Sequence, residues 1–266
     1  MRIRRFSPVQ KAFHVLLMLT FMLQAASGLS RMYIESVWGT RLTSVFGGYA
    51  GALEVHKTVG VLMLLLFAGH ICYALYIVAA VRIDKHDSLI PRRSDVREFG
   101  QHVRWMLGGD PPRFERWGYW EKFDYWAVFW GMVVLGVTGL LLYSPQTTAT
   151  YLKGWSLNIA LWLHRIEACL AMLHVFVIHF AIVHMRRESF PMDRAMFCGD
   201  SEYASASEKW PRWIARLKNA GLLQDRLAED VSVVRLTISY IFGLAIVVAG
   251  VYLLIGGLAN IRFISW

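Results

Sequence analysis

Four histidines lie within one apolar stretch of 21 residues, HRIEACLAMLHVFVIHFAIVH, which runs from His164 to His184. They are His164, His174, His179 and His184. An imidazole nitrogen can ligate a metal ion or a haem iron, exchange a hydrogen bond, or change its charge near neutral pH. Because an unpaired polar group is costly in an apolar medium, this pattern indicates a site that occupies the ring nitrogens.

The element that carries these histidines is one of five apolar runs, each near the roughly 20 residues that a membrane-spanning helix needs. The runs cover about 11–30, 56–80, 123–143, 159–185 and 231–256. The 266-residue chain is 56% hydrophobic and only 18% charged, a composition that excludes an ordinary soluble domain. Three scattered cysteines without a CxxCH motif exclude covalently attached haem. The sequence predicts an all-α integral membrane protein.

The distribution of basic residues predicts the topology. Twenty Lys and Arg residues fall at the N-terminus and in the segments 81–120 and 186–230, whereas four fall in the segments on the other side. By the positive-inside rule, the N-terminus is cytoplasmic and the C-terminus lies outside, as in a multi-pass protein of the bacterial inner membrane. The net charge of +9 therefore reflects topology, and no nucleic-acid partner is expected.

The same pattern divides the chain into three segments. Residues 1–186 are expected to form a four-helix transmembrane domain, 187–230 a cytoplasmic loop, and 231–266 a fifth transmembrane helix with a short outer tail. Within the loop, WPRWIARLKNAGLL mixes tryptophan and leucine with basic residues at helical spacing. This stretch fits either a helix at the membrane surface or a plain connecting helix.

Histidines on different helices fall at two depths. On the second helix, His56 and His70 share one face and lie roughly 21 Å apart along the axis. On the fourth helix, His164 and His179 differ by about 60° in direction and roughly 22 Å in height. Pairing by depth therefore sets His56 opposite His164, and His70 opposite His179.

The first helix runs the other way and brings His14 near the deeper level, close to His179 and His184. His174 points away from His164 and His179 on a uniform α-helical wheel, so it is expected to be a hydrogen-bonding residue. Facing imidazoles at two levels are what bis-histidine haem b requires. The fold predicted is a four-helix haem-binding bundle plus one additional C-terminal transmembrane helix.

Four helix motifs, within about residues 4–200, resemble the bacterial di-haem cytochrome b membrane subunits of formate dehydrogenase (the gamma subunit) and of nickel hydrogenases. They are HVLLMLTFMLQAASGL, HKTVGVLM, FWGMVVLGVTGLLLY and LHRIEACLAMLHVFVIH. The resemblance implies transmembrane electron transfer through two b haems. By matching, His56 and His164 hold the outer haem, and His14 and His179 hold the inner one.

The sequence departs from this family in three ways: it has His70 and His184, a long segment RRESFPMDRAMFCGD after the fourth helix, and a fifth helix, whose role stays open. By depth alone, His70 and His14 are equally good partners for His179. If His70 and His179 pair, His14 and His184 could hold a third haem. Two haems and three haems therefore both remain expectations, with two preferred.

The resemblance also implies a quinone site beside the inner haem, for menaquinone or ubiquinone. The junction GYWEKFDYW brings Glu121, Lys122 and Asp124 to the start of the third helix on the expected cytoplasmic side. We expect these residues to support quinone binding or proton transfer. The family's Asn and second Gly correspond here to Gly118 and Trp120, so identical contacts do not carry over.

The function predicted is that of a membrane-anchoring cytochrome b subunit of a quinone-linked respiratory complex. Its partner would be an iron–sulfur or multihaem cytochrome c subunit on the periplasmic side, because the chain has no flavin, molybdenum or iron–sulfur motif. The alternatives are a self-contained haem b reductase of ferric or ascorbate type and a histidine-based metal or proton transporter. The partner's identity, the primary electron donor and the direction of electron flow are not predicted.

Overall fold

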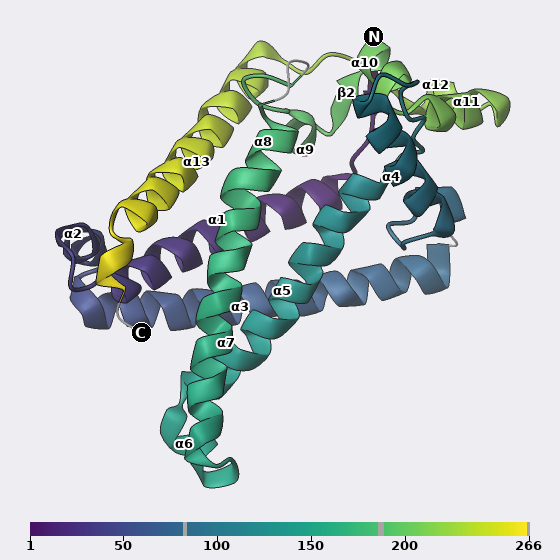
Figure 1. The fold of residues 1–266 in the computed structure, drawn as a ribbon. Coiled ribbons are helices and arrows are strands. Elements are labelled where there is room, and N and C mark those ends of the chain that lie inside the picture. The colour runs from purple at the N-terminus through teal and green to yellow at the C-terminus, as the bar shows by residue number, and fades with distance from the viewer. Residues whose placement is uncertain (82–83, 186–188, 265–266) are drawn as a thin grey trace. The chain divides into compact units, whose positions relative to one another are not determined.

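The computed structural model describes residues 1–81, 84–185 and 189–264 and consists mainly of helices (Figure 1). Five helical segments are long and apolar enough to cross a membrane. They are α1 (Pro8–Met32), α3 with η1 (Gly48–Val81), α5 (Tyr119–Tyr143), α7 to α8 (Gly154–Val183) and α13 (Val233–Ala259). The prediction of an all-α membrane protein with five spans is confirmed.

The first four spans begin earlier than the apolar runs, because hydropathy marks the apolar core of a helix rather than its ends. The second span starts at Gly48 instead of about residue 56, and the fourth at Gly154 instead of 159. Two spans also contain a π-helical segment, η1 (Ile77–Val81) after α3 (Gly48–Tyr76) and η3 (His174–His179) between α7 (Gly154–Leu173) and α8 (Phe180–Val183). Uniform α-helical periodicity does not predict these segments.

Shorter elements connect the spans. They are α2 (Val37–Val45), η2 (Lys85–Asp87), α4 (Arg93–Met106), α6 (Pro145–Tyr151), α9 (Ala195–Cys198), α10 (Tyr203–Lys209), α11 (Pro211–Asn219), α12 (Leu223–Arg226) and η4 (Ile261–Phe263). Three short strands accompany them: β1 (Arg2–Arg4), β2 (Asp200–Glu202) and β3 (Leu227–Ala228).

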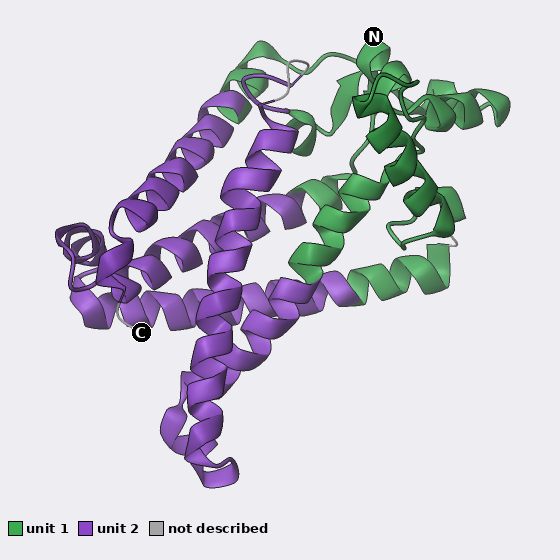
Figure 2. Ribbon diagram, viewed as in Figure 1, with its two compact units in different colours: residues 1–11, 72–129, 194–239 green, residues 12–71, 130–193, 240–266 purple. Residues whose placement is uncertain are grey.

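The chain forms two compact units (Figure 2). Unit 1 comprises residues 1–11, 72–129 and 194–239, and unit 2 comprises 12–71, 130–193 and 240–266. These units cut across the predicted segments 1–186, 187–230 and 231–266, because the loop segments pack on each other and on neighbouring parts of the spans. The predicted boundary between residues 186 and 187 lies outside the described residues.

Unit 2 has an apolar core in which α1 and α13 pack on the π-helical part of the fourth span. The Phe21 and Phe176 rings meet edge to face at 5.8 Å between centroids. On α13, a methyl group added at Gly250 would lie 2.8 Å from Phe180 and 2.9 Å from Phe176. The fifth helix therefore covers the irregular segment η3 and the start of α8.

Unit 1 is organised around a three-stranded antiparallel sheet in the order β2-β1-β3. Ile3 of β1 is fully buried against α10 and α11, and Trp213 of α11 is 1% exposed. The other apolar residues of α11, Ile214 and Leu217, are buried in the same cluster. The helix predicted within 187–230 therefore exists, and its apolar face packs on protein in the manner of a connecting helix.

Candidate functional site

His56 and His164 face each other in unit 2. His56 lies two turns into α3 and His164 nearly three turns into α7, so the two helices bring them to one level. Their ring centroids are 6.2 Å apart and the ring planes are inclined at 78°. The structure thus brings together the two histidines that depth alone paired.

The Nδ1 atom of each of these rings is held by a hydroxyl group from another helix. Ser27 Oγ of α1 lies 3.0 Å from His56 Nδ1, and Thr138 Oγ1 of α5 lies 2.9 Å from His164 Nδ1. Each hydroxyl donates its own hydrogen to its helix backbone, Ser27 to Leu23 O at 2.6 Å and Thr138 to Val134 O at 2.7 Å. The hydroxyl oxygens therefore accept from Nδ1–H, which leaves each Nε2 with a lone pair for a metal.

A glycine follows each of the two hydroxyl residues and makes room for the ring. A methyl group added at Gly28 would lie 3.3 Å from His56 Cε1, and one added at Gly139 would lie 3.4 Å from His164 Cε1. The Ser-Gly pair of α1 and the Thr-Gly pair of α5 thus surround their histidine rings in the same way, and we call each pair a cradle. Sequence reasoning missed the role of Ser27 and Thr138, although the two Ser/Thr-Gly pairs were visible in the first and third helix motifs.

This arrangement fits a six-coordinate haem iron. A metal–nitrogen bond of about 2 Å on each side of an iron puts two axial imidazole centres roughly 6 Å apart. The separation of 6.2 Å between His56 and His164 matches that value. His56 and His164 would therefore hold a haem through their Nε2 atoms.

Unit 2 also carries His14, His70 and His179. The ring of His70 on α3 meets the ring of Phe13 on α1 edge to face at 5.4 Å. Because Phe13 precedes His14, this contact sets His70 and His14 at the same level of neighbouring helices. Both residues are half-buried, as is His179 at the end of η3.

The π-helical segment η3 changes the directions expected for the histidines of the fourth span. It begins at His174 and ends at His179. In a π-helix the backbone bonds link residues five apart, so such residues come to nearly the same side. A uniform α-helical wheel therefore does not describe the segment between His174 and His179. Single π-helical turns inside α-helices often occur at functional sites.

His184 follows α8 and has a partner of its own. Its Nδ1 accepts a hydrogen bond from the backbone N–H of Asp193 at 3.3 Å, and its ring lies 6.1 Å from that of His179. With Nδ1 accepting, the neutral ring carries its hydrogen on Nε2. This hydrogen-bonding role distinguishes His184 from His56 and His164, whose Nδ1 atoms face acceptors.

The quinone candidates lie in unit 1, in the first two turns of α5. Glu121 is bound on several sides: Arg5 donates to Oε1 at 3.0 Å, and the backbone N–H of Gly118 donates to Oε2 at 3.0 Å. Lys122 is buried and donates to Asp95 Oδ1 of α4 at 2.7 Å. Asp124 is half-buried. Glu121 thus anchors the start of α5, whereas Lys122 is part of a buried polar cluster.

Glu98 of α4 belongs to this cluster and was missed in the sequence, where it sits among other charges. It is 3% exposed, and its Oε2 has no hydrogen-bond partner among the described residues. Burial and the neighbouring Asp95 raise the pKa of Glu98 to about 7, against the opposing effect of Lys122 and of Arg212, whose Nη1 lies 3.7 Å away. Glu98 can therefore exchange a proton near neutral pH.

The family described as prokaryotic cytochrome b561 matches residues 5–197 of the chain. The matched range contains the first four spans and the paired histidines His56 and His164. No curated protein matches the chain. The resemblance to bacterial b-type cytochrome membrane subunits is confirmed at the level of this family. The chain belongs to the prokaryotic cytochrome b561 family and is a membrane cytochrome that binds b-type haem and transfers electrons.

Proposed function

We propose that this cytochrome is the membrane-anchoring subunit of a respiratory complex and carries electrons between a partner redox subunit and the quinone pool. The observation that carries the proposal is the facing pair His56 and His164, with each Nδ1 bonded to a hydroxyl oxygen. A redox haem needs such fixed ligands, because a ligand that changes orientation between oxidation states slows electron transfer.

Two b haems are proposed. His56 and His164 hold the first, and His179 with either His14 or His70 holds the second. Each haem, when bound, supplies a one-electron carrier inside the membrane. The chain's own contribution is to fix the tautomer of each ligand through Ser27 and Thr138 and to keep the site among apolar helices. The hydrogen bond from Asp193 to His184 supports a count of two rather than three.

The quinone is proposed to bind near the start of α5, where Lys122, Asp124 and Glu98 lie in unit 1. Quinone reduction consumes protons, so its site requires a group that exchanges protons near neutral pH. The raised pKa of Glu98, about 7, supports that role, and Lys122 and Asp95 supply fixed charges beside it. The ion pair of Glu121 with Arg5 makes Glu121 a positioning residue for this junction.

The partner is proposed to dock on the side opposite the basic loops. The excess of Lys and Arg in 81–120 and 186–230 supports a cytoplasmic position for these segments, in a bacterial inner membrane. The N-terminus would then be cytoplasmic and the C-terminus periplasmic. An iron–sulfur or multihaem cytochrome c protein would exchange electrons with the haem at His56 and His164.

The test is haem reduction by a quinol in membranes that contain the full chain. Addition of menaquinol or ubiquinol should reduce both b haems, and Glu98→Gln and Asp124→Asn should slow that reduction at unchanged haem content. An exposed control, Glu208→Gln on α10, should leave the rate unchanged. A self-contained ferric or ascorbate reductase would be reduced by ascorbate and not by quinol, and a metal or proton transporter would contain no haem.

A further inference from the structure

Unit 1 contains a cavity of about 600 Å³, which is within the size range of small-molecule sites. Four arginines line it: Arg4, Arg5, Arg116 and Arg226. Its only acidic lining residues among those described are Asp84 and Asp87. The quinone candidates at the start of α5 are not part of this lining.

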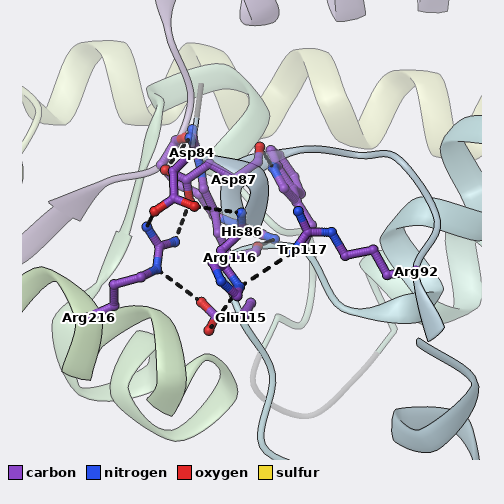
Figure 3. Close-up of polar contacts among 9 residues, drawn as sticks. Asp84, His86, Asp87, Arg92, Glu115, Arg116, Trp117 and Arg216 are labelled. Carbon is purple, nitrogen blue, oxygen red and sulfur yellow. Dashed lines mark hydrogen bonds and ion pairs between the residues drawn. The ribbon is translucent and has the colours of Figure 1, made fainter. Parts of the chain in front are cut away.

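The two aspartates are also engaged by a residue outside the lining. Arg216 of α11 donates to Asp84 Oδ2 at 3.1 Å and to Asp87 Oδ1 at 2.6 Å, and it also reaches Glu115 at 3.3 Å (Figure 3). Figure 3 shows the carboxylates of Asp84 and Glu115 directed at the Arg216 guanidinium. The two aspartates therefore serve Arg216 as well as the lining arginines, which outnumber them four to two.

Arg116 and Arg226 differ in their partners, and Arg116 Nη1 lies 3.9 Å from Asp87 Oδ2. The side chain of Arg116 is 12% exposed, and its Nε has no hydrogen-bond partner among the described residues. Burial lowers the pKa of Arg116 to about 10; Asp87 opposes this effect, while the like charges of Arg226, Arg5 and Arg216 reinforce it. Arg226 forms no hydrogen bond or ion pair with any described residue. The lining thus holds four guanidinium groups and two carboxylates, a formal excess of two positive charges.

One wall of the cavity is apolar. Tyr73, Ile77 and Val81 line it at intervals of four residues, at the end of the second membrane span. A cavity with arginines on one side and the end of a transmembrane helix on the other has the chemistry of a lipid headgroup site. Arginine favours phosphate in particular, because its planar guanidinium can bind two phosphate oxygens at once.

We propose that this cavity binds a phosphate ester, presented by an anionic phospholipid whose acyl chains lie along Tyr73, Ile77 and Val81. Arg116 and Arg226 bind the phosphate oxygens, and Arg4 adds charge at the rim. The ligand would fasten the N-terminal strand, the end of the second span and α12 to one another, since all three contribute to the lining.

The test uses the full chain, purified in a mild detergent and stripped of lipid. Binding of short-chain phosphatidylglycerol, short-chain phosphatidylcholine and inorganic phosphate is measured by titration. We expect phosphatidylglycerol to bind best and Arg226→Gln to weaken it about tenfold, the usual effect of removing a hydrogen bond to a charged group. Arg226→Lys should weaken it less, because the charge remains. Arg97→Gln, an exposed change on α4, should have no effect.

Comparing the three ligands distinguishes a lipid phosphate from a soluble one. Tight binding of inorganic phosphate that also depends on Arg226 would support the phosphate site with a soluble ligand as its occupant. Equal binding of phosphatidylcholine and phosphatidylglycerol, or full binding by Arg226→Gln, would overturn the proposal. Unchanged haem content and helicity establish that each variant is folded.

Discussion

The two compact units use their polar side chains in different ways. In unit 2 the hydroxyls of Ser27 and Thr138 hold histidine rings between apolar helices. In unit 1 charged side chains hold one another, as in the contacts of Arg216 with Asp84 and Asp87. The polar groups of unit 2 therefore orient ligand atoms, whereas those of unit 1 connect segments that are distant in the sequence.

We therefore expect substitutions of polar side chains to have different effects in the two units. Changes to the polar groups of unit 2 should alter haem binding while the protein remains folded. Changes to the polar groups of unit 1 should alter stability, protonation or binding of small anions while each folded molecule keeps its haem.

Removal of His179 should abolish the second haem entirely. In His179→Ala membranes the b haem content should fall by half, because the first haem keeps His56 and His164 as ligands. Haem counts in His14→Ala and His70→Ala then identify the partner of His179. If each of these two variants lost a different haem, the count would be three and the two-haem proposal would be wrong.

The buried carboxyl of Glu98 should make stability depend on pH in unit 1. Its pKa is about 7 in the folded protein and 4.5 ordinarily, so its contribution is fully favourable below pH 4.5 and is lost as the pH rises through 7. The difference corresponds to about 3 kcal/mol. We therefore expect Glu98→Gln to unfold at a higher temperature than the wild type at pH 8.5.

Near pH 4.5 the two proteins should unfold at similar temperatures, with their haem content equal throughout. Thermal unfolding in detergent across this pH range, with Glu208→Gln as the exposed control, is the measurement. A constant difference between variant and wild type at every pH would contradict the assigned protonation of Glu98.

The hydroxyls of Ser27 and Thr138 should affect haem affinity without affecting the fold. Loss of such a supporting hydrogen bond costs about tenfold or more in the affinity of a metal site. Ser27→Ala and Thr138→Val should each lose the first haem faster to a haem-scavenging protein. Thr20→Val is the matched control, because Thr20 Oγ1 also bonds a backbone carbonyl, Leu16 O at 2.8 Å, but holds no histidine. Equal loss in all three variants would reject the supporting role.

The smallest effect is expected at the glycines beside the first pair. Gly139→Ala adds a methyl group 3.4 Å from His164 Cε1, so the ring must shift by a few tenths of an ångström. The ring planes of His56 and His164 are inclined at 78°, which predicts a strongly anisotropic electron paramagnetic resonance signal from the low-spin ferric haem. The displacement of the His164 ring should change this signal. Gly154→Ala at the start of α7, the helix that carries His164, should leave the signal unchanged, because nothing lies within 4 Å of the added methyl group.

The sequence predicted the parts of this molecule that depend on hydropathy and regular spacing. The five spans and the pairing of His56 with His164 follow from apolar length and from α-helical rise, which hold in α3 and α7. The π-helical segment η3 was not predicted, because a local π-helix has no periodic signature. Glu98 was missed, since its burial arises from contacts with residues that lie far away in the chain.

The sheet of unit 1 was also not predicted. Its strands are two or three residues long and join the N-terminus to residues near 200 and 227, so no alternating pattern could reveal them. The cradles of Ser27 and Thr138 are an intermediate case. Their Ser/Thr-Gly pairs stood in the helix motifs, but the geometry was needed to show that each hydroxyl faces a histidine.

The central claim is that His56 and His164 would together hold one haem. Its most direct test is His164→Gly, purified with and without added imidazole, with haem content and the low-spin spectrum as readouts. We predict loss of one haem in the variant and recovery of that haem, with a low-spin spectrum, when free imidazole occupies the vacated position. Full haem content in His164→Gly without imidazole would contradict the account.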